Sequence, residues 1–369
     1  MRKNSRLLID GSAIRQNIEA IRRRLGTGTK IIPVIKDDAY GLGLVPVARM
    51  LAACPGTDLL AVAHPWEGAA LREAGIETDI LVMGSCLRDQ MPEAIEKGLI
   101  LTAGRPGIAA ELEEAAREAG RTARVHIKLE TGLNRDGVAP GAELGALLAQ
   151  MKAAAHVKSE GVYTHCKDDF DPACCQRQAE LFEAGLAQIR AAGLETGLRH
   201  WLDSAAADRY PAYAYDGVRI GRGLYMDDPF SPFGDRREAV SWRCSVVDVR
   251  ERAAGETLGY GGGVTLTHSA RVAALNVGYG DGLDYRLAAN GAQVLLRGTR
   301  CPILTVFMDR TLIDAGTLDV RPGEEVTLFG YDADGNLLSS QEQAALIGDK
   351  EGCGLTAGLT ERVERVFEE

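Results

Sequence analysis

The sequence lacks long hydrophobic runs and an excess of positive charge. Its N-terminal segment has basic residues but only three consecutive apolar ones, residues 7–9, and no run elsewhere approaches the length of a membrane span. We therefore expect neither a secretory signal peptide nor contact with a membrane. The formal net charge of -10, without a local basic stripe, argues against a nucleic-acid-binding protein.

Paired cysteines are missing as well. Of the eight cysteines, Cys174 and Cys175 are adjacent and the others lie far apart, which fits neither a disulfide framework nor the ligand spacing of a zinc site. The pattern favours reduced thiols, so we expect a cytoplasmic protein without a metal cofactor.

What the sequence does contain is an alternation of short apolar runs and amphipathic stretches over residues 10–231. The amphipathic stretches have apolar residues at three- and four-residue spacing, and several end at glycine, as helices do. Eight β-then-α units predict a parallel sheet, and eight is the number that closes a TIM (β/α)8 barrel. A doubly wound sheet is the alternative. The expected strands are residues 31–36, 59–63, 79–84, 99–104, 123–130, 161–165, 198–204 and 217–221.

The composition changes after residue 231. The remaining chain is rich in strand-like runs that are broken by Gly and Pro turns, and it has few helical patterns. We therefore expect a second, mostly β domain over residues 232–369, with residues 1–9 packing against it.

Residues 31–43, IIPVIKDDAYGLG, place one lysine at the end of a predicted strand. Pro33 suits an edge or an end position in that strand. Lys36 is either a structural partner of Asp37 or Asp38, or an amine whose surroundings adapt it for chemistry. This stretch alone leaves both interpretations open.

Polar residues lie at the ends of several predicted strands, including the one that ends at Lys36. Because reactive groups gather at the C-terminal ends of the strands in such a barrel, we expect these residues to share one rim. Any single one can be structural: Lys128 could pair with Glu130, and His165 could cap its strand. The set comprises Lys36, Lys128, His165, Asp203, Ser204 and Arg219.

A reactive lysine without a metal cluster indicates Schiff-base chemistry, for which pyridoxal phosphate is the commonest partner. Its phosphate requires hydroxyls and backbone N–H groups near the last barrel strands, where Ser204, Gly221 and the Arg222 amide are expected. Tyr40 lies one helical turn from the lysine. Arg219 would be an unusual partner for the ring nitrogen, because a guanidinium does not give up its proton. The ring would then remain a weaker electron sink, which suits racemisation.

The chain contains eight motifs in the order and spacing of bacterial alanine racemases: VIKDDAYGLG, HIKLETGLNRDG, YTH, DSAA, VRIGRGLY, LGYGG, VGYGDG and FMD. It resembles that family over nearly its whole length. The resemblance implies a barrel followed by a β domain, pyridoxal phosphate as cofactor and a small amino acid as substrate. It also implies a head-to-tail homodimer, in which each site combines barrel groups of one subunit with β-domain groups of the other.

The same resemblance implies that two bases interconvert L-alanine and D-alanine on the cofactor. Lys36 is similar to the lysine that forms the Schiff base and serves as one base, and Tyr260 to the opposing base from the partner subunit. His165 resembles the residue that orients Tyr260, and Arg219 resembles the one that holds the ring nitrogen. Free lysine and tyrosine both have pKa values of about 10, so both need a lowered pKa to work near neutral pH.

The resemblance also implies binding residues. Arg135 is similar to an arginine near the phenolic oxygen of the cofactor and the substrate carboxylate, and Lys128 to a lysine that is often carbamylated to hold that arginine. The Met308 amide resembles a donor to the substrate carboxylate, with Asp309 beside it, and Tyr279 resembles a tyrosine of the substrate entrance. The expected phosphate cradle consists of Tyr40, Ser204, Gly221 and Arg222.

The chain departs from the family pattern near the expected site. Asp37 and Asp38 stand where Ala-Asn is common, and Leu42 stands where histidine is frequent. Phe307 replaces a usual cysteine. Cys353 occupies the place of a tyrosine that contacts the phosphate and narrows the entrance. Losing that bulk could admit a larger side chain, so alanine is the first expected substrate, and serine or a wider set of amino acids is the second.

Three other functions stay open. A pyridoxal-phosphate-dependent amino-acid decarboxylase can share a barrel and a β domain, but it usually has an acidic partner for the ring nitrogen where this chain has Arg219. A non-catalytic pyridoxal-phosphate carrier resembles the barrel alone, which leaves residues 232–369 without a purpose. A binding or structural protein with a decayed site is disfavoured, because both candidate bases are present.

Overall fold

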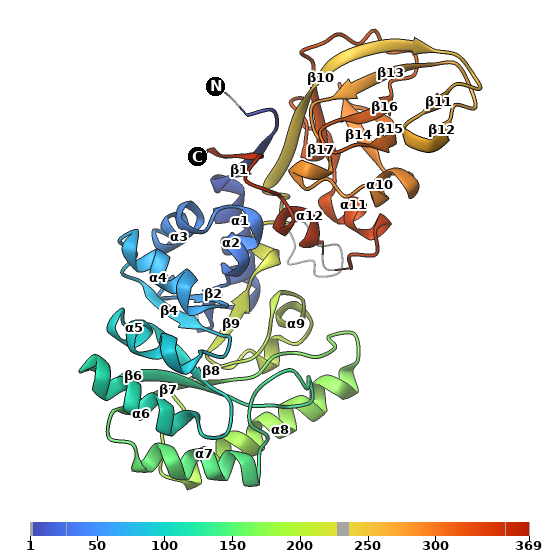
Figure 1. Cartoon of the computed structure of the whole chain (residues 1–369). Coiled ribbons are helices and arrows are strands. Elements are labelled where there is room, and N and C mark those ends of the chain that lie inside the picture. Colours follow the sequence, from blue (N-terminus) through green and yellow to red (C-terminus); the bar gives the residue numbers. More distant parts are fainter. Residues whose placement is uncertain (1–2, 27, 227–235, 351, 369) are drawn as a thin grey trace.

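The computed structural model describes residues 3–26, 28–226, 236–350 and 352–368. The chain forms a helix-covered barrel followed by a strand-rich part (Figure 1). The predicted boundary between residues 231 and 232 lies outside the described residues.

The barrel is one sheet of eight parallel strands in the order β2-β9-β8-β7-β6-β5-β4-β3. A bridge between Val34 and Ala61 joins its two edges just beyond β2. The predicted TIM barrel is therefore confirmed, and the doubly wound alternative is wrong. Its strands are β2 (Lys30–Pro33), β3 (Leu59–Val62), β4 (Asp79–Val82), β5 (Ile100–Ala103), β6 (Ala123–Lys128), β7 (Val157–Tyr163), β8 (Leu198–His200) and β9 (Gly217–Ile220).

Several of these strands end earlier than expected. β2 ends at Pro33 rather than at Lys36, and β8 ends at His200 rather than at Ser204. The Asp203 side chain accepts a hydrogen bond of 3.0 Å from the Ala206 amide, which makes it the N-cap of the next helix. Polar residues after these apolar runs therefore start turns and helices at the rim instead of prolonging the strands.

Helices surround the barrel on its outside (Figure 1). Aspartate caps begin two of the longest: Asp10 accepts from the Ala13 amide at 2.8 Å, and Asp171 accepts from the Ala173 amide at 2.9 Å. The elements are α1 (Gly11–Leu25), α2 (Lys36–Gly41), α3 (Leu44–Ala52), α4 (Pro65–Glu73), α5 (Met91–Glu96), α6 (Ile108–Ala119), α7 (Ala142–Ala153), α8 (Pro172–Ala191) and α9 (Ser204–Arg209), with 3-10 turns η1 (Arg88–Gln90), η2 (Pro211–Tyr213) and η3 (Arg222–Leu224).

Two groups of buried residues in and just beyond the barrel strands bear on the site, one apolar and one polar. The apolar group comprises Ile32, Val34, Leu59, Ala61, Leu81 and Ile100, from β2 to β5. The polar group comprises Thr102, His126, Lys128, Tyr163, His200 and Arg219, from β5 to β9. Because buried polar side chains are costly unless they bond to one another, the second group marks the side of the barrel where chemistry is expected.

The remaining strands form a nine-stranded sheet in the order β18-β17-β14-β15-β16-β13-β10-β1-β19, and β10 also pairs with β17. β1 pairs antiparallel with β10 and parallel with β19, so the first and last strands lie side by side in this sheet. The expected mostly β second part is confirmed. The strands are β1 (Arg6–Asp10), β10 (Val240–Arg252), β13 (Ala270–Leu275), β14 (Gln293–Leu296), β15 (Thr299–Val306), β16 (Thr311–Asp314), β17 (Glu325–Tyr331), β18 (Leu337–Leu338) and β19 (Glu364–Glu368).

Short elements complete the strand-rich part. They are the hairpin strands β11 (Thr257–Leu258) and β12 (Val264–Thr265), the 3-10 turns η4 (Tyr260–Gly262) and η5 (Tyr279–Asp281), and the helices α10 (Arg286–Ala289), α11 (Ser340–Leu346) and α12 (Gly354–Ala357). In the part of the chain that the structure describes, no helix combines the length and the apolar character needed to cross a membrane.

Candidate active site

Lys36 begins a turn of unusual hand at the barrel rim. Within α2, Asp37, Asp38, Ala39 and Tyr40 have φ angles between 54° and 60°, so this turn is left-handed. The left-handed conformation costs about 1–2 kcal/mol per residue for L-amino acids. Four such residues in a row persist only where the surroundings hold them.

Two carboxylates and one close backbone contact hold this turn. Buried Glu67 accepts hydrogen bonds from the backbone amides of Asp37 (2.6 Å), Ala63 (2.8 Å) and His64 (2.8 Å). The Asp38 carboxylate accepts from the Leu44 amide at 2.7 Å. At Gly41 (φ 82°), a Cβ atom would lie 2.0 Å from the carbonyl oxygen of Thr356 in α12, so the chain packs against it without room for a side chain.

The left-handed turn brings Tyr40 to the end of β9. A Cβ atom on Gly221 would lie 2.0 Å from the Tyr40 hydroxyl oxygen, so only glycine allows this approach. The Ser204 hydroxyl accepts from the Gly223 amide at 3.3 Å. Burial raises the pKa of Tyr40, which keeps its hydroxyl protonated as a donor. Two hydroxyls and the glycine backbone that begins η3 thus converge at the rim, which is the donor set that a phosphate group requires.

A chain of polar side chains crosses the barrel below the rim. Arg219 donates to Nδ1 of His165 at 3.1 Å and to Nδ1 of His200 at 2.8 Å. Nε2 of His200 lies 3.0 Å from Nδ1 of His126. Burial lowers the pKa of Arg219 to about 10, lowers that of His126 to about 4, and also lowers the pKa of His200. At neutral pH, Arg219 therefore remains the cation and the histidines stay neutral.

This network fixes the protonation of His165. Its Nδ1 atom accepts from Arg219, so its proton resides on Nε2, which lies 3.9 Å from Asp203 Oδ2. Burial and the nearby cations, Arg219 first among them, lower the pKa of His165. A neutral imidazole thus points one N–H donor into the rim.

A third group lies at the end of β6. Buried Lys128 has its Nζ atom 2.5 Å from Asp136 Oδ1, and Nε of Arg135 lies 3.5 Å from the same oxygen. Glu130 accepts from the amide of Asn134 at 2.9 Å, and it also accepts from the Gly132 amide. The suggested structural pairing of Lys128 with Glu130 is therefore wrong, because Glu130 closes the turn that follows the strand.

The remaining predicted residues lie on the strand-rich part, in one exposed patch. The Tyr260 ring packs edge-on against Phe307, with centroids 5.6 Å apart, and the Tyr279 amide donates to the Phe307 carbonyl oxygen at 2.9 Å. The Gly280 amide donates to the Met308 carbonyl oxygen at 2.8 Å. Tyr260 is 90% exposed, and Met308 and Tyr279 are also exposed. We call Tyr260, Tyr279, Phe307, Met308 and Asp309 the tyrosine patch.

Within one chain, the tyrosine patch does not meet the barrel rim. Tyr260 follows β11 in the hairpin at the far end of the strand-rich part, whereas Lys36 follows β2 inside the barrel (Figure 1). The structure therefore brings the barrel residues together in one group and the patch residues in another, and it keeps Lys36 and Tyr260 apart.

Cys353 is the one predicted feature of the strand-rich part that reaches the barrel group. It is the N-cap residue of α12, which packs against the left-handed turn through Thr356. After burial, the ionisable thiol of Cys353 is the next cause of the raised pKa of Tyr40, and α12 packs against the turn that carries Tyr40. A cleft of about 520 Å³ begins one residue further on, and its lining includes Tyr279, Gly354 and Leu355.

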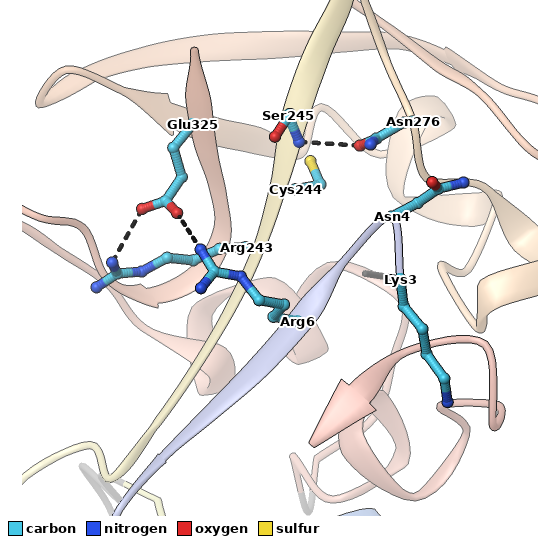
Figure 2. A pocket seen from close by; sticks show the side chains of 8 residues that line it. All are labelled: Lys3, Asn4, Arg6, Arg243, Cys244, Ser245, Asn276 and Glu325. Atoms are coloured by element: carbon cyan, nitrogen blue, oxygen red, sulfur yellow. Dashed lines mark hydrogen bonds and ion pairs between the residues drawn. The ribbon is translucent and has the colours of Figure 1, made fainter. Parts of the chain in front are cut away.

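A smaller cavity of about 150 Å³ is lined by residues of β1, β10 and β17 (Figure 2). Glu325 accepts from Arg6 at 2.8 Å and from Arg243 at 2.9 Å, and Asn276 accepts from the Ser245 amide at 2.9 Å. The ion pairs link β1 and β10 to β17, and the hydrogen bond links β10 to the residue after β13. The cavity contains none of the predicted site residues.

Sequence reasoning missed several residues of the barrel group. His126 precedes Lys128 by two positions, so both point to the same side of β6, and this alternation could have identified it. His200 and Glu67 carry no such signal, because a single polar residue in an apolar run is most often an ordinary satisfied side chain. Asp136 adjoins a predicted residue, yet its contact with Lys128 spans a loop whose course the sequence does not reveal.

Fold and site together define a class: barrel enzymes with a lysine and a phosphate-type cradle at the rim and a strand-rich part that follows. The family model described as "Alanine racemase, N-terminal domain" matches residues 9–229, and that described as "Alanine racemase, C-terminal domain" matches residues 239–367. The chain belongs to the alanine racemase family, whose members are pyridoxal-phosphate-dependent isomerases.

Individual relatives agree with this assignment. The alanine racemase of Symbiobacterium thermophilum is 35% identical over 366 residues, which cover 97% of this chain and 96% of that protein. The alanine racemase of Halothermothrix orenii is 33% identical and covers 97% and 95%, respectively. Among solved structures, the alanine racemase of Bacillus anthracis with bound L-Ala-P has a TM-score of 0.91 and 29% identity, covering 100% of this chain and 96% of that one.

The residues of this chain fit the family's cofactor. Tyr40, Ser204 and the backbone at Gly221 would hold the phosphate, because a hydroxyl and a side-chain-free backbone approach each other there to within contact distance. Arg219 offers the ring nitrogen a donor that keeps its proton, and Lys36 offers a partly exposed amine at the same rim. In the described residues, no cluster of side chains could hold a metal ion instead.

Proposed function

We propose that this chain interconverts L-alanine and D-alanine with pyridoxal phosphate, as a cytoplasmic homodimer whose two sites are shared between subunits. The observation that carries the proposal is the separation of Lys36 and Tyr260 into two complementary groups on one chain. A racemase that works with two bases needs both at one carbon atom, and two head-to-tail copies supply each rim with a tyrosine patch. The buried thiols of the chain support a reducing compartment.

The surface of the tyrosine patch supports its burial in a dimer. Tyr260, Tyr279 and Met308 of the patch are large side chains that a lone chain exposes to water. Neighbouring exposed apolar residues of this kind are typical of surfaces that a partner covers. We also propose that residues 10–231 form the barrel domain and that residues 232–369 form the second domain, which carries the tyrosine patch.

When bound, pyridoxal phosphate supplies the carbonyl group that links to amines and the electron-withdrawing ring that acidifies the substrate α-hydrogen. Lys36 takes or returns the proton on one face of the α-carbon, and Tyr260 of a second copy does so on the other face. Inversion in one pass requires an acceptor on one face and a donor on the other. The Nε2–H of His165, whose ring Arg219 holds, would donate to the Tyr260 phenol oxygen and stabilise its deprotonated form.

Other residues bind and orient the substrate. Arg135 is the cation for the substrate carboxylate, and the Met308 amide of the second copy is a further donor, with Asp309 beside it. Lys128 supports Arg135 from the end of β6. Tyr279 of the second copy narrows the approach to the site.

Serine is the second candidate substrate, because of one specific observation. Cys353 lies beside Tyr40 where a tyrosine is usual in the family, and a thiol leaves more room than a phenol ring. The additional hydroxymethyl group of serine could occupy that room.

The test is the reaction of the cofactor-loaded protein with a panel of L-amino acids in deuterated water. We expect D-alanine to form fastest, with deuterium at the α-carbon and no release of carbon dioxide, and Lys36→Ala to abolish the reaction. Release of carbon dioxide without formation of D-alanine would show that the reaction is decarboxylation and not racemisation. Bound cofactor without any α-hydrogen exchange would instead indicate a non-catalytic carrier.

A further inference from the structure

Lys128, Asp136 and Arg135 meet at the end of β6, and Asp136, which lies between the two cations, has no assigned role. Asp136 Oδ1 lies 2.5 Å from Lys128 Nζ and 3.5 Å from Arg135 Nε, so one carboxylate oxygen contacts both cations. Lys128 is 4% exposed, and the Asp136 oxygen is buried. Among the described residues, Asp136 is the only carboxylate that approaches Lys128 within ion-pair distance.

The charge balance explains why this carboxylate matters. A buried ammonium group is costly unless an anion pairs with it. Burial is the main cause that lowers the pKa of Lys128, and Arg135 and Arg219 act in the same direction. Asp136 acts in the opposite direction, because its nearby charge favours the protonated amine. Without Asp136, three cationic groups would face one another here, and Lys128 would be the one able to lose its proton.

We propose that Asp136 is a positioning residue: its carboxylate links Lys128 to Arg135, so Arg135 is held for the substrate while Lys128 stays an unmodified ammonium group. In this chain the Asp136 side chain supplies the anion that a carbamate on Lys128 would otherwise supply, and no carbamate forms. The inference rests on the proposed function for the role of Arg135, but the chemical state of Lys128 can be measured without any activity.

The reaction that Asp136 would prevent is the formation of a carbamate on Lys128. A neutral lysine amine attacks the carbon of carbon dioxide, an N–C bond forms, one C=O electron pair moves to oxygen as a carboxylate, and the amine proton passes to solvent. The reaction requires a free amine lone pair and space beside Nζ. Asp136 opposes both, because its charge favours the protonated amine and its oxygen occupies a position next to Nζ.

The first test labels the protein with ¹³C-bicarbonate and searches for a carbamate signal by NMR. We expect none in the wild-type protein, and racemase activity that does not depend on added bicarbonate. In Asp136→Asn, Lys128 loses its anion, so we expect a carbamate signal that disappears in the Asp136→Asn, Lys128→Met double variant. A carbamate on wild-type Lys128 would overturn the proposal, whether or not the protein racemises alanine.

The second test measures kinetics. We expect Asp136→Asn to lower kcat/KM for alanine roughly 10- to 100-fold without bicarbonate, because Arg135 is no longer held. Added bicarbonate should restore part of the loss, and Asp136→Glu should retain more activity without it. Asp319→Asn, which changes an exposed carboxylate of the strand-rich part, is the matched control. Wild-type kinetics in Asp136→Asn at every bicarbonate concentration would contradict the positioning role.

Discussion

We propose that Cys353 affects substrate selectivity without touching the reacting atoms. It lies on the N-cap of α12, beside Tyr40 and at the edge of the cleft that includes Tyr279. Tyr40 belongs to the group that fits the phosphate, so a bulkier residue at position 353 would narrow the space between the cradle and the cleft. Under the proposed function, the space here would decide which substrate side chains are accepted.

The variant Cys353→Tyr should therefore sharpen the preference for alanine over serine. A pocket without room for one additional group disfavours the larger substrate by about 1–3 kcal/mol. The ratio of kcat/KM for alanine to that for serine should therefore rise roughly 10-fold or more. Cys353→Ala adds no bulk and should leave the ratio near its wild-type value. An unchanged ratio in Cys353→Tyr would remove Cys353 from the account of selectivity.

The residues that sequence alone identified share one property. Lys36, Lys128 and His165 follow apolar runs, and in a barrel such positions lie at the rim, so position along the chain indicates position in space. The contacts that adjust them were not accessible in this way. His200 and Asp136 act through partners that are distant in sequence or across a loop, and nothing in their immediate neighbours reveals those partners.

Among the elements, the left-handed turn that begins at Lys36 is the most unusual. A short helix at this place would follow from the sequence, but its hand would not, because none of the residues 37–40 is glycine. The turn depends on acceptors elsewhere: Glu67 comes from α4, and Asp38 bonds forward to Leu44. Strands were predictable because apolar runs form them locally, whereas this turn is imposed by tertiary contacts.

Removal of the Glu67 carboxylate should loosen the turn. In Glu67→Gln, an amide group replaces one of two oxygens that accept from three backbone amides, so at least one buried donor loses its acceptor. We expect the free energy of unfolding to fall by about 1–3 kcal/mol, measured by urea denaturation of the holoenzyme. Glu73→Gln, on the same helix but exposed, should change it by less than about 0.5 kcal/mol. Equal stability of the two variants would show that Glu67 does not hold the turn.

At the scale of the whole molecule, the chain carries two separate groups of candidate site residues. The barrel group contains the lysine, the cradle and the Arg219 network, and the tyrosine patch contains the second candidate base. The sequence predicted both sets of residues and the two parts of the fold, because each motif is local. Their separation within one chain, which only the family resemblance implied, is visible in the arrangement of the two parts (Figure 1).

The most direct test of this account mixes two inactive variants, Lys36→Ala and Tyr260→Phe. In a heterodimer of the two, one site carries both substitutions and the other carries neither. Random exchange of subunits makes about half of the dimers mixed, each with one intact site of two, so we predict recovery of about a quarter of the wild-type racemase activity. Verified heterodimers with no more activity than the separate variants would contradict the claim that each site joins Lys36 of one copy to Tyr260 of another.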